Sequence, residues 1–342
     1  MTPITKKFSH LGFSLTFYLV LSNVLSTIVL FIFFFIYAFI HLFNNPQINP
    51  FLLVSQAQVF IRENMFLSTI LTSLPGYFIA IPLTILFLNS RKYQDIPLPG
   101  FSFETPYEKT IGRKLSVSEY IMYILFLMPL GLIGSSIGAA IASVLSMISG
   151  TNITDALSRT ISEMQPWQVL ITTCILAPIF EEILFRYAVI GYTRRYGEWN
   201  SIFLSALIFG LVHANIFQFF YAFMIGILLG YVYIQTRNLL YTISMHMIFN
   251  FFGAFVPVLL SPDGSLNTAT IVYTAFQAVV AIVGLVLLVY YIIRGNIVKF
   301  DSSKPIPGIG HPDVYLNPGM LCFFMLVLLL TIYTTIMSTY GL

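Results

Sequence analysis

Charged residues are scarce in this sequence, and their scarcity decides the class of protein. Asp, Glu, Lys and Arg make up 8% of the 342 residues, whereas 58% are hydrophobic and the mean hydropathy is +0.88. Because a soluble domain carries about 25% charged residues, the composition excludes a large soluble core and predicts a polytopic membrane protein. The basic residues form no tract interleaved with aromatic side chains, so we expect no nucleic-acid partner.

Cysteine is nearly absent as well. Cys174 and Cys322 both lie in apolar segments, so the chain has neither a disulfide framework nor a CxxC zinc site. An HExxH zinc motif is also missing. After Lys6 and Lys7 the first apolar run extends for about 30 residues, far beyond the core of a cleavable signal peptide. We therefore expect this run to be retained as the first membrane helix.

Long apolar runs are what the sequence has in abundance. A membrane-spanning helix needs about 20 predominantly apolar residues, and runs of this length occur at 12–43, 66–88, 119–148, 168–192, 216–236, 239–260, 268–293 and 319–340. The run 201–214 is shorter, and we predict it to be a separate helix that ends at Asn215. The expected fold is thus an all-α, polytopic transmembrane helical bundle of about nine spans, or eight if 201–236 is one element.

The basic residues orient this bundle. With a cytoplasmic N-terminus, nine spans leave only Arg62 and Arg159 outside and Arg186 within the fourth span, so 13 of the 16 Lys and Arg residues lie in cytoplasmic segments. The positive-inside rule expects this asymmetry. Eight spans would move the three basic residues that follow residue 293 to the outside. We therefore prefer nine spans, with the N-terminus inside and the C-terminus outside.

The organisation of the chain follows from these spans. The polar loop 89–118 contains three prolines and predicts an irregular cytoplasmic connection. Small residues four apart, at Gly134 and Gly138 and at Gly226 and Gly230, favour close helix packing. We divide the chain into two N-terminal spans with the cytoplasmic loop (1–118), a core (119–293) and a cytoplasmic loop with the last span (294–342).

Ionisable and amide side chains inside the predicted spans mark a candidate site. An ionisable group near the bilayer centre costs about 2.5–3.5 kcal/mol on insertion scales and is functional by default. The residues in question are Glu181, Glu182, Arg186, His213, His246 and Asn250. At about 1.5 Å per residue, their depths on three helices agree within two helical turns. This agreement predicts one shared site in the cytoplasmic half of the membrane.

Helical spacing predicts how these side chains pair. Glu182 and Arg186 are four residues apart and can form an ion pair, whereas Glu181 points about 100° away and stays free. His246 and Asn250 are also four apart and face one spot. Pro178 removes a backbone hydrogen bond just before Glu181, and a kink there would open the helix to water.

These groups suffice for peptide hydrolysis without a covalent nucleophile. A Glu–His pair can deprotonate a water and later protonate the leaving amine. A His–Asn pair can donate hydrogen bonds to the oxyanion of a tetrahedral intermediate, worth about 3–4 kcal/mol per donor. Glu and His are equally proper ligands of zinc, so the residues alone leave a metal mechanism open.

Three motifs in order resemble those of a known family. Glu181-Glu-Ile-Leu-Phe-Arg186, Phe209-Gly-Leu-Val-His213 and His246-Met-Ile-Phe-Asn250 look like the EExxxR, FxxxH and HxxxN motifs of the CPBP family. These are the CAAX-protease and bacteriocin-processing intramembrane proteases, also called Abi proteins, related to the type II CAAX prenyl endopeptidase. The resemblance covers about residues 165–255, roughly a quarter of the chain.

The resemblance implies a role for each motif residue. Glu181 and His213 would activate the water, and His246 and Asn250 would form the oxyanion hole. Glu182, Arg186 and Phe209 would support the site. No cofactor is required in this interpretation; if the enzyme were metal-dependent, zinc would be held by Glu181, His213 and His246. Tyr187 departs from the family, which often has Gly after the motif Arg.

We therefore expect an intramembrane endopeptidase that cleaves near the cytoplasmic membrane face. Its partners would be a peptide or membrane-protein substrate and the lipid bilayer, and its location a bacterial cell membrane as a multi-pass protein. The alternative is a non-catalytic scaffold or bacteriocin-immunity protein of the same fold. A transporter that uses Glu181 as a proton relay is weaker, because the His–Asn pair would have no task in it.

Overall fold

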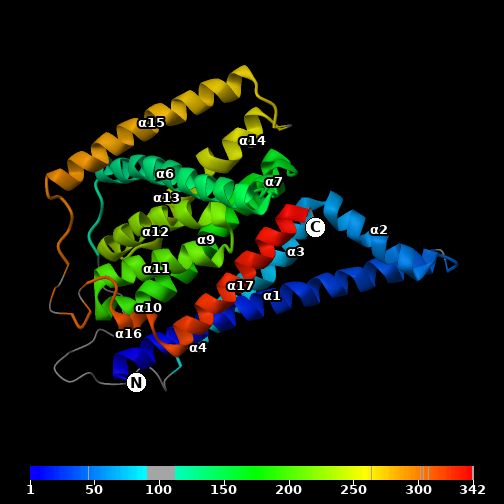
Figure 1. Ribbon diagram of the computed structural model, residues 1–342, viewed down its shortest axis with the longest axis horizontal. Helices are drawn as coiled ribbons and strands as arrows, with labels where there is room; N and C mark the ends of the chain where they lie inside the picture. Colours follow the sequence, from blue (N-terminus) through cyan, green and yellow to red (C-terminus); the bar gives the residue numbers. More distant parts are fainter. Residues whose placement is uncertain are drawn as a thin grey trace.

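A computed structural model describes residues 1–44, 46–90, 112–262, 264–300, 302, 304–306 and 308–340. Within these ranges the chain forms helices joined by turns, and eight helices are long and apolar enough to cross a membrane (Figure 1). The predicted all-α, multi-pass membrane protein is confirmed. Most of the predicted loop 89–118, including its prolines, lies outside the described residues; the part from residue 112 leads into the next helix without regular structure.

The N-terminal part is a long helical hairpin. Its outgoing helix, α1, is 42 residues long, or about 63 Å at 1.5 Å per residue. The returning side runs antiparallel to it, as shown by the bond from Ser26 Oγ to the Thr72 carbonyl (2.6 Å) and the His10 Nε2 contact with the Phe87 carbonyl (3.0 Å). These elements are α1 (Pro3–Asn44), α2 (Pro50–Glu63), α3 (Met65–Pro75), the π-helical η1 (Gly76–Ala80) and α4 (Ile81–Leu88).

The fourth span is one helical path whose α-helical winding is interrupted by two π-helical segments. It comprises α8 (Pro166–Val169), η2 (Leu170–Leu176), α9 (Ala177–Glu182), η3 (Ile183–Ile190), α10 (Gly191–Thr193) and η4 (Arg194–Tyr196), of which η2 and η3 are π-helical. Two further helices precede it, α6 (Val117–Ser149) and the short α7 (Ala156–Ser162). The predicted irregularity near Pro178 thus takes the form of π-helical segments, which often accompany functional sites.

The predicted division of 201–236 into two helices is confirmed. Helix α11 (Glu198–Val212) is followed by a turn and by α12 (Ile216–Thr236). Ala214 in this turn has φ +47°, a left-handed conformation uncommon for a residue with a side chain. The Asn215 side chain caps α12 by accepting a hydrogen bond from the Phe217 N–H (2.9 Å). The turn therefore reverses the chain directly after His213.

The remaining helices complete the bundle and place the C-terminus. They are α13 (Leu239–Asn250), the π-helical η5 (Phe251–Phe255), α14 (Val256–Leu260), α15 (Thr268–Ile293), α16 (Pro312–Tyr315) and α17 (Pro318–Tyr340). Helix α17 starts beside the start of α1, where the Gly319 N–H donates to Ser9 Oγ (3.0 Å), and it runs parallel to α1 (Figure 1). The two termini therefore lie at opposite ends of this helix pair, as nine passes require.

Small residues bring the central helices together, as predicted. A Cβ on Gly134 or Gly138 of α6 would collide with the α12 backbone, and one on Gly226 of α12 would press on Ala206 of α11. Close backbone approach of this kind is what holds membrane helices together in place of a hydrophobic driving force. The inner helices are the most buried. In the most apolar stretch of 18 residues, half of the residues of α12 are buried, against 11% of those of α15. The candidate site lies among these inner helices.

The hairpin also holds an element that the sequence did not predict. Helix α2 has 14 residues, too few for a span, and includes two glutamines, Arg62 and Glu63. The first apolar run was likewise placed too late, because α1 already begins at Pro3. Residues 3–11 do not form an apolar run, because Lys6, Lys7 and His10 lie among them. They are nevertheless helical and largely buried, since this part of α1 packs against α4 and α17.

Candidate active site

The predicted ion pair lies at the centre of the site. Glu182 Oε2 is 3.1 Å from Arg186 Nε, and both side chains are fully buried. The Arg186 guanidinium also lies 4.7 Å from the ring centroid of Phe209, and its Nη2 is 3.5 Å from the Gly226 carbonyl. Charges at this depth persist because each neutralises the other. Phe209 thus supports the pair through a cation–π contact.

His246 lies between the two glutamates, a contact that the sequence did not predict. Its Nδ1 is 3.0 Å from Glu182 Oε1, and its Nε2 is 3.7 Å from Glu181 Oε2. Since a carboxylate only accepts, Nδ1 carries the proton and donates to Glu182. Glu182 therefore contacts Arg186 on its own helix and both His246 and Thr242 on α13. Glu181 keeps 23% of its side chain exposed, in contrast to its buried neighbour.

His213 is held by its own helix at the end of α11. Its Nδ1 is 2.7 Å from the Phe209 carbonyl, and its ring meets the Phe209 ring edge to face at 5.1 Å. Because a carbonyl only accepts, Nδ1 carries a proton and donates it to this carbonyl. Nε2 is therefore the ring nitrogen left for a partner in the space in front of it, and in the neutral tautomer it is an acceptor.

Asn250 reaches the backbone that Pro178 disturbs. In η2 the Ala177 N–H bonds to the Thr172 carbonyl, five residues back. The next bond in this pattern would join residue 178 to Thr173, but proline has no N–H. Asn250 Nδ2 donates to the Thr173 carbonyl instead, at 2.8 Å. This bond fixes the amide of Asn250 and leaves its second N–H for other partners.

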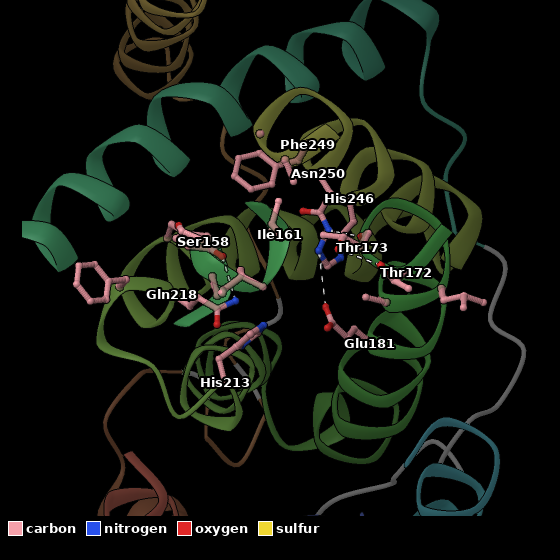
Figure 2. A pocket seen from close by; sticks show the side chains of 18 of the residues that line it. Ser158, Ile161, Thr172, Thr173, Glu181, His213, Gln218, His246, Phe249 and Asn250 are labelled. Carbon is pink, nitrogen blue, oxygen red and sulfur yellow. Dashed lines mark hydrogen bonds and ion pairs between the residues drawn. The ribbon is translucent and has the colours of Figure 1, made fainter. Parts of the chain in front are cut away.

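The four predicted catalytic residues share one cavity. It has a volume of about 740 Å³ and is lined by Glu181, His213, His246 and Asn250, together with Phe209. Figure 2 shows their side chains around one hollow, with Glu181 from α9, His213 from the turn after α11, and His246 and Asn250 from α13. Glu181 and His246 approach each other across it, whereas His213 lies on another wall. The sequence thus identified residues that the fold brings together.

Elements far from the motifs complete the walls. Helix α3 and η1 contribute Ser73 and Tyr77, and α7 contributes Ser158. The Tyr77 ring is stacked on that of Phe180, directly before Glu181, with ring centroids 4.6 Å apart. Sequence reasoning missed these residues, because tyrosines and serines at such positions carry no signal of their own in an apolar chain rich in both.

The donor set does not fit the zinc alternative. In the parts of the chain that the structure describes, His, Cys, Asp and Glu form no group of three or more arranged to hold a metal ion. Glu181 and His246 lie 3.7 Å apart, but His213 does not belong to a group of three with them. We therefore derive no chemical step through a metal.

Comparisons with known proteins bear on the same segment. Residues 163–252 match the family model "Type II CAAX prenyl endopeptidase Rce1-like". The chain is 31% identical over 87 residues to the "Putative membrane peptidase YdiL" of Bacillus subtilis (strain 168). This alignment covers 25% of the chain and 35% of that protein, so the chain spans about a third of the relative's length. No solved structure matches the chain.

The match coincides with the site. The segment contains all three motifs, from Glu181 to Asn250, and the predicted resemblance to the CAAX proteases is thereby confirmed. The N-terminal hairpin, α15 and α17 lie outside it. The segment that carries the candidate site in this multi-pass membrane protein is therefore similar to the type II CAAX prenyl endopeptidase Rce1-like family.

Proposed function

We propose that this protein is a membrane-embedded peptidase that hydrolyses a peptide bond in the cavity around Glu181. One observation carries the proposal: Glu181, His213, His246 and Asn250, from three separate elements, line a single cavity of about 740 Å³. Substrate pockets usually measure about 300–1,000 Å³. The likeness of the site segment to a prenyl endopeptidase family and to a protein named as a membrane peptidase supports the same reaction class.

Glu181 and His213 bind the attacking water. Both present acceptors, the Glu181 carboxylate and Nε2 of His213. A water that donates one hydrogen to each turns an oxygen lone pair towards the substrate carbonyl. Glu181 takes the water proton as the oxygen attacks the carbonyl carbon, and delivers it to the amine nitrogen as the C–N bond breaks. The products are a carboxyl group and an amine, and Glu181 returns to its starting state.

His246 and Asn250 stabilise the oxyanion in this mechanism. In this role His246 carries a proton on each ring nitrogen, Nδ1 beside Glu182 Oε1 at 3.0 Å and Nε2 beside Glu181 Oε2 at 3.7 Å. Nδ1–H then binds Glu182, and Nε2–H is available to the substrate oxygen. The second N–H of Asn250 is the other donor. Glu182 thus holds His246 in position.

The substrate we propose is an extended segment of a membrane protein or membrane-bound peptide. The cavity is walled by spans of the bundle, so its substrate must reach it at the membrane. The name of the matched family refers to prenylated CAAX ends, so a lipidated C-terminus is one form of this substrate class. Cleavage near the cytoplasmic face would follow from the orientation that the basic residues predict.

The test is to compare membrane proteomes and released peptides of cells that carry the wild-type protein, Glu181→Gln or His213→Ala. We expect both variants to insert and fold but to leave the substrate uncleaved. The matched control is Glu163→Gln, the same chemical change at an exposed glutamate paired with Arg159. Cleavage that continues in Glu181→Gln refutes the proposal, and a cellular phenotype kept by both inactive variants identifies a scaffold instead.

Cofactor use is tested on the purified protein. We propose that no metal is needed, so substrate cleavage survives prolonged chelation and the protein holds no stoichiometric zinc. Loss of activity that added zinc restores would establish a metal mechanism and refute the roles assigned to Glu181 and His213.

A further inference from the structure

A second, smaller cavity lies behind the catalytic glutamate. It measures about 250 Å³, and Ser73, Tyr77, Glu181 and His213 line both this cavity and the larger one. The two residues assigned to the attacking water thus stand between two spaces. We call the smaller one the rear chamber. Its lining residues are Tyr18, Leu19, Ser22, Asn23, Thr72, Ser73, Gly76, Tyr77, Ile81, Glu181, Leu184, Phe185, Val212 and His213.

The rear chamber lies between the matched segment and the N-terminal hairpin, and the hairpin, which is outside that segment, supplies nine of its fourteen lining residues. On α1 its residues are 18, 19, 22 and 23, and on α3 and η1 they are 72, 73, 76 and 77. Each set follows the i, i+1, i+4, i+5 spacing of one helix face. Stacking of Tyr77 on Phe180 (4.6 Å) and the edge contact of Phe78 with the same ring (5.0 Å) hold this hairpin against α9.

The chemistry of the walls selects water as the occupant. Eight of the fourteen lining residues are polar, namely two tyrosines, two serines, a threonine and an asparagine with Glu181 and His213, and the other six are non-polar. A cavity of this polarity holds water, whereas apolar cavities stay dry, and each liquid water occupies about 30 Å³. Among the described residues, no Lys or Arg side chain lines the chamber. An anionic ligand would therefore find no positive partner there and would be repelled by the Glu181 carboxylate. Its volume is sufficient for several waters.

We propose that the rear chamber is the water store of the peptidase, from which the attacking water reaches Glu181 and His213. This inference rests on the proposed function. A substrate that fills the larger cavity displaces the water there. Each hydrolysis nevertheless consumes one water: its oxygen and one hydrogen join the carbonyl carbon as a hydroxyl group, and its other hydrogen joins the amine nitrogen. Water held on the other side of Glu181 meets this need without leaving the site. Glu181, whose nearest recorded partner is His246 Nε2 at 3.7 Å, is also hydrated from there.

Thiol accessibility tests the water content independently of catalysis. With Cys174 and Cys322 replaced by Ala, Ser22→Cys places a thiol in the chamber, and Val24→Cys, two residues on, places one on the exposed apolar side of the same helix. Because only the thiolate reacts and it forms in water, a small charged methanethiosulfonate should modify Ser22→Cys in native membranes at least tenfold faster. Equal rates at the two positions overturn the proposal.

Filling the chamber tests its role in turnover. Ser22→Leu should lower kcat at least tenfold with little change in KM, whereas Val24→Leu should leave both unchanged. Gly76→Ala is the gentler variant, because its Cβ would lie 2.6 Å from Ser22 Oγ and displace that hydroxyl into the chamber. Full activity in both filled variants, with Glu181→Gln inactive, overturns the water store and leaves the peptidase intact. Cleavage by Glu181→Gln refutes the peptidase, while the thiol rates still decide whether the chamber holds water.

Discussion

Replacing Glu182 by Gln should destabilise the protein far more than it slows the reaction. The substitution keeps the size of the side chain but removes the carboxylate that neutralises Arg186, which is fully buried and 3.1 Å away. What remains near the guanidinium is the Gly226 carbonyl at 3.5 Å and the face of Phe209. Breaking a buried pair in this way costs about 3–5 kcal/mol. Since domains are stable by about 5–15 kcal/mol, much of the protein should unfold in mild denaturant.

Removing the second charge should restore most of the lost stability. In Glu182→Gln/Arg186→Met the unpaired cation is gone, and the flexible thioether fills its space. Buried pairs replaced by apolar or neutral groups often cost nothing in stability. We expect the double variant to recover to within about 1–2 kcal/mol of the wild type, which is a strong coupling between the two positions.

Activity should not recover with stability. The amide that Glu182→Gln introduces can still accept a hydrogen bond from Nδ1 of His246, which lies 3.0 Å from Glu182 Oε1 in the wild type, but a neutral acceptor holds the ring less strongly than a carboxylate does. The loss from a charged to a neutral hydrogen bond is about 1–1.5 kcal/mol, which corresponds to about 5- to 10-fold in kcat. Folding is followed by unfolding titrations in detergent micelles, and kcat by cleavage of the identified substrate. This account of Glu182 would be refuted if Glu182→Gln were as stable as the wild type. It would also be refuted if Glu182→Gln/Arg186→Met were no more stable than Glu182→Gln.

Two further substitutions probe contacts of the site. Asn250→Ala should lower kcat by about 10²–10³, as loss of an oxyanion donor does. It should also destabilise the protein by about 1–3 kcal/mol, because the Thr173 carbonyl loses its partner; kcat and the midpoint of unfolding check both effects. Thr334→Val removes the bond from Thr334 Oγ1 to the Ala214 carbonyl (2.5 Å), worth about 1 kcal/mol. It should lower kcat severalfold by loosening the turn after His213, unlike Thr331→Val, whose hydroxyl bonds to the Val327 carbonyl of its own helix. Equal kcat values in the two threonine variants would contradict a role for α17.

The fold was predictable to the extent that the lipid dictates it. Inside a bilayer every backbone group must be bonded within the segment, so a run of about 20 apolar residues leaves little choice but a helix. The division between α11 and α12 is an instructive case, since hydropathy alone allowed one long helix. The basic residues after residue 293 favoured an extra pass, and the turn at Ala214 separates the 15-residue α11 from α12 as that prediction expected. Helix α2 escaped prediction because no such rule applies to a 14-residue helix.

The site was predictable where one helix determines the geometry. The spacing of Glu182 and Arg186 fixes their contact, because residues four apart share a helix face whatever surrounds the helix. The position of His246 between two glutamates depends on how α13 is rotated relative to α9. The spacing of residues within one helix cannot predict the rotation of one helix relative to another. The Asn250 bond to Thr173 had a partial signal in Pro178, which predicted a free carbonyl but not the side chain that would bind it.

The two ends of the chain complete what the matched segment begins. His213 comes from that segment, yet the turn that follows it is held by Thr334 of α17, and the space behind it is closed by Tyr18 of α1. Helix α17 in turn is fixed to α1 through Ser9 and Gly319. In the proposed mechanism the reacting groups all come from residues 163–252, whereas α1 and α17, which contact each other although they are about 300 residues apart, line or support the space around them. Replacing the hairpin or α17 should consequently change which substrates are cleaved and how fast, before it changes the chemistry of cleavage.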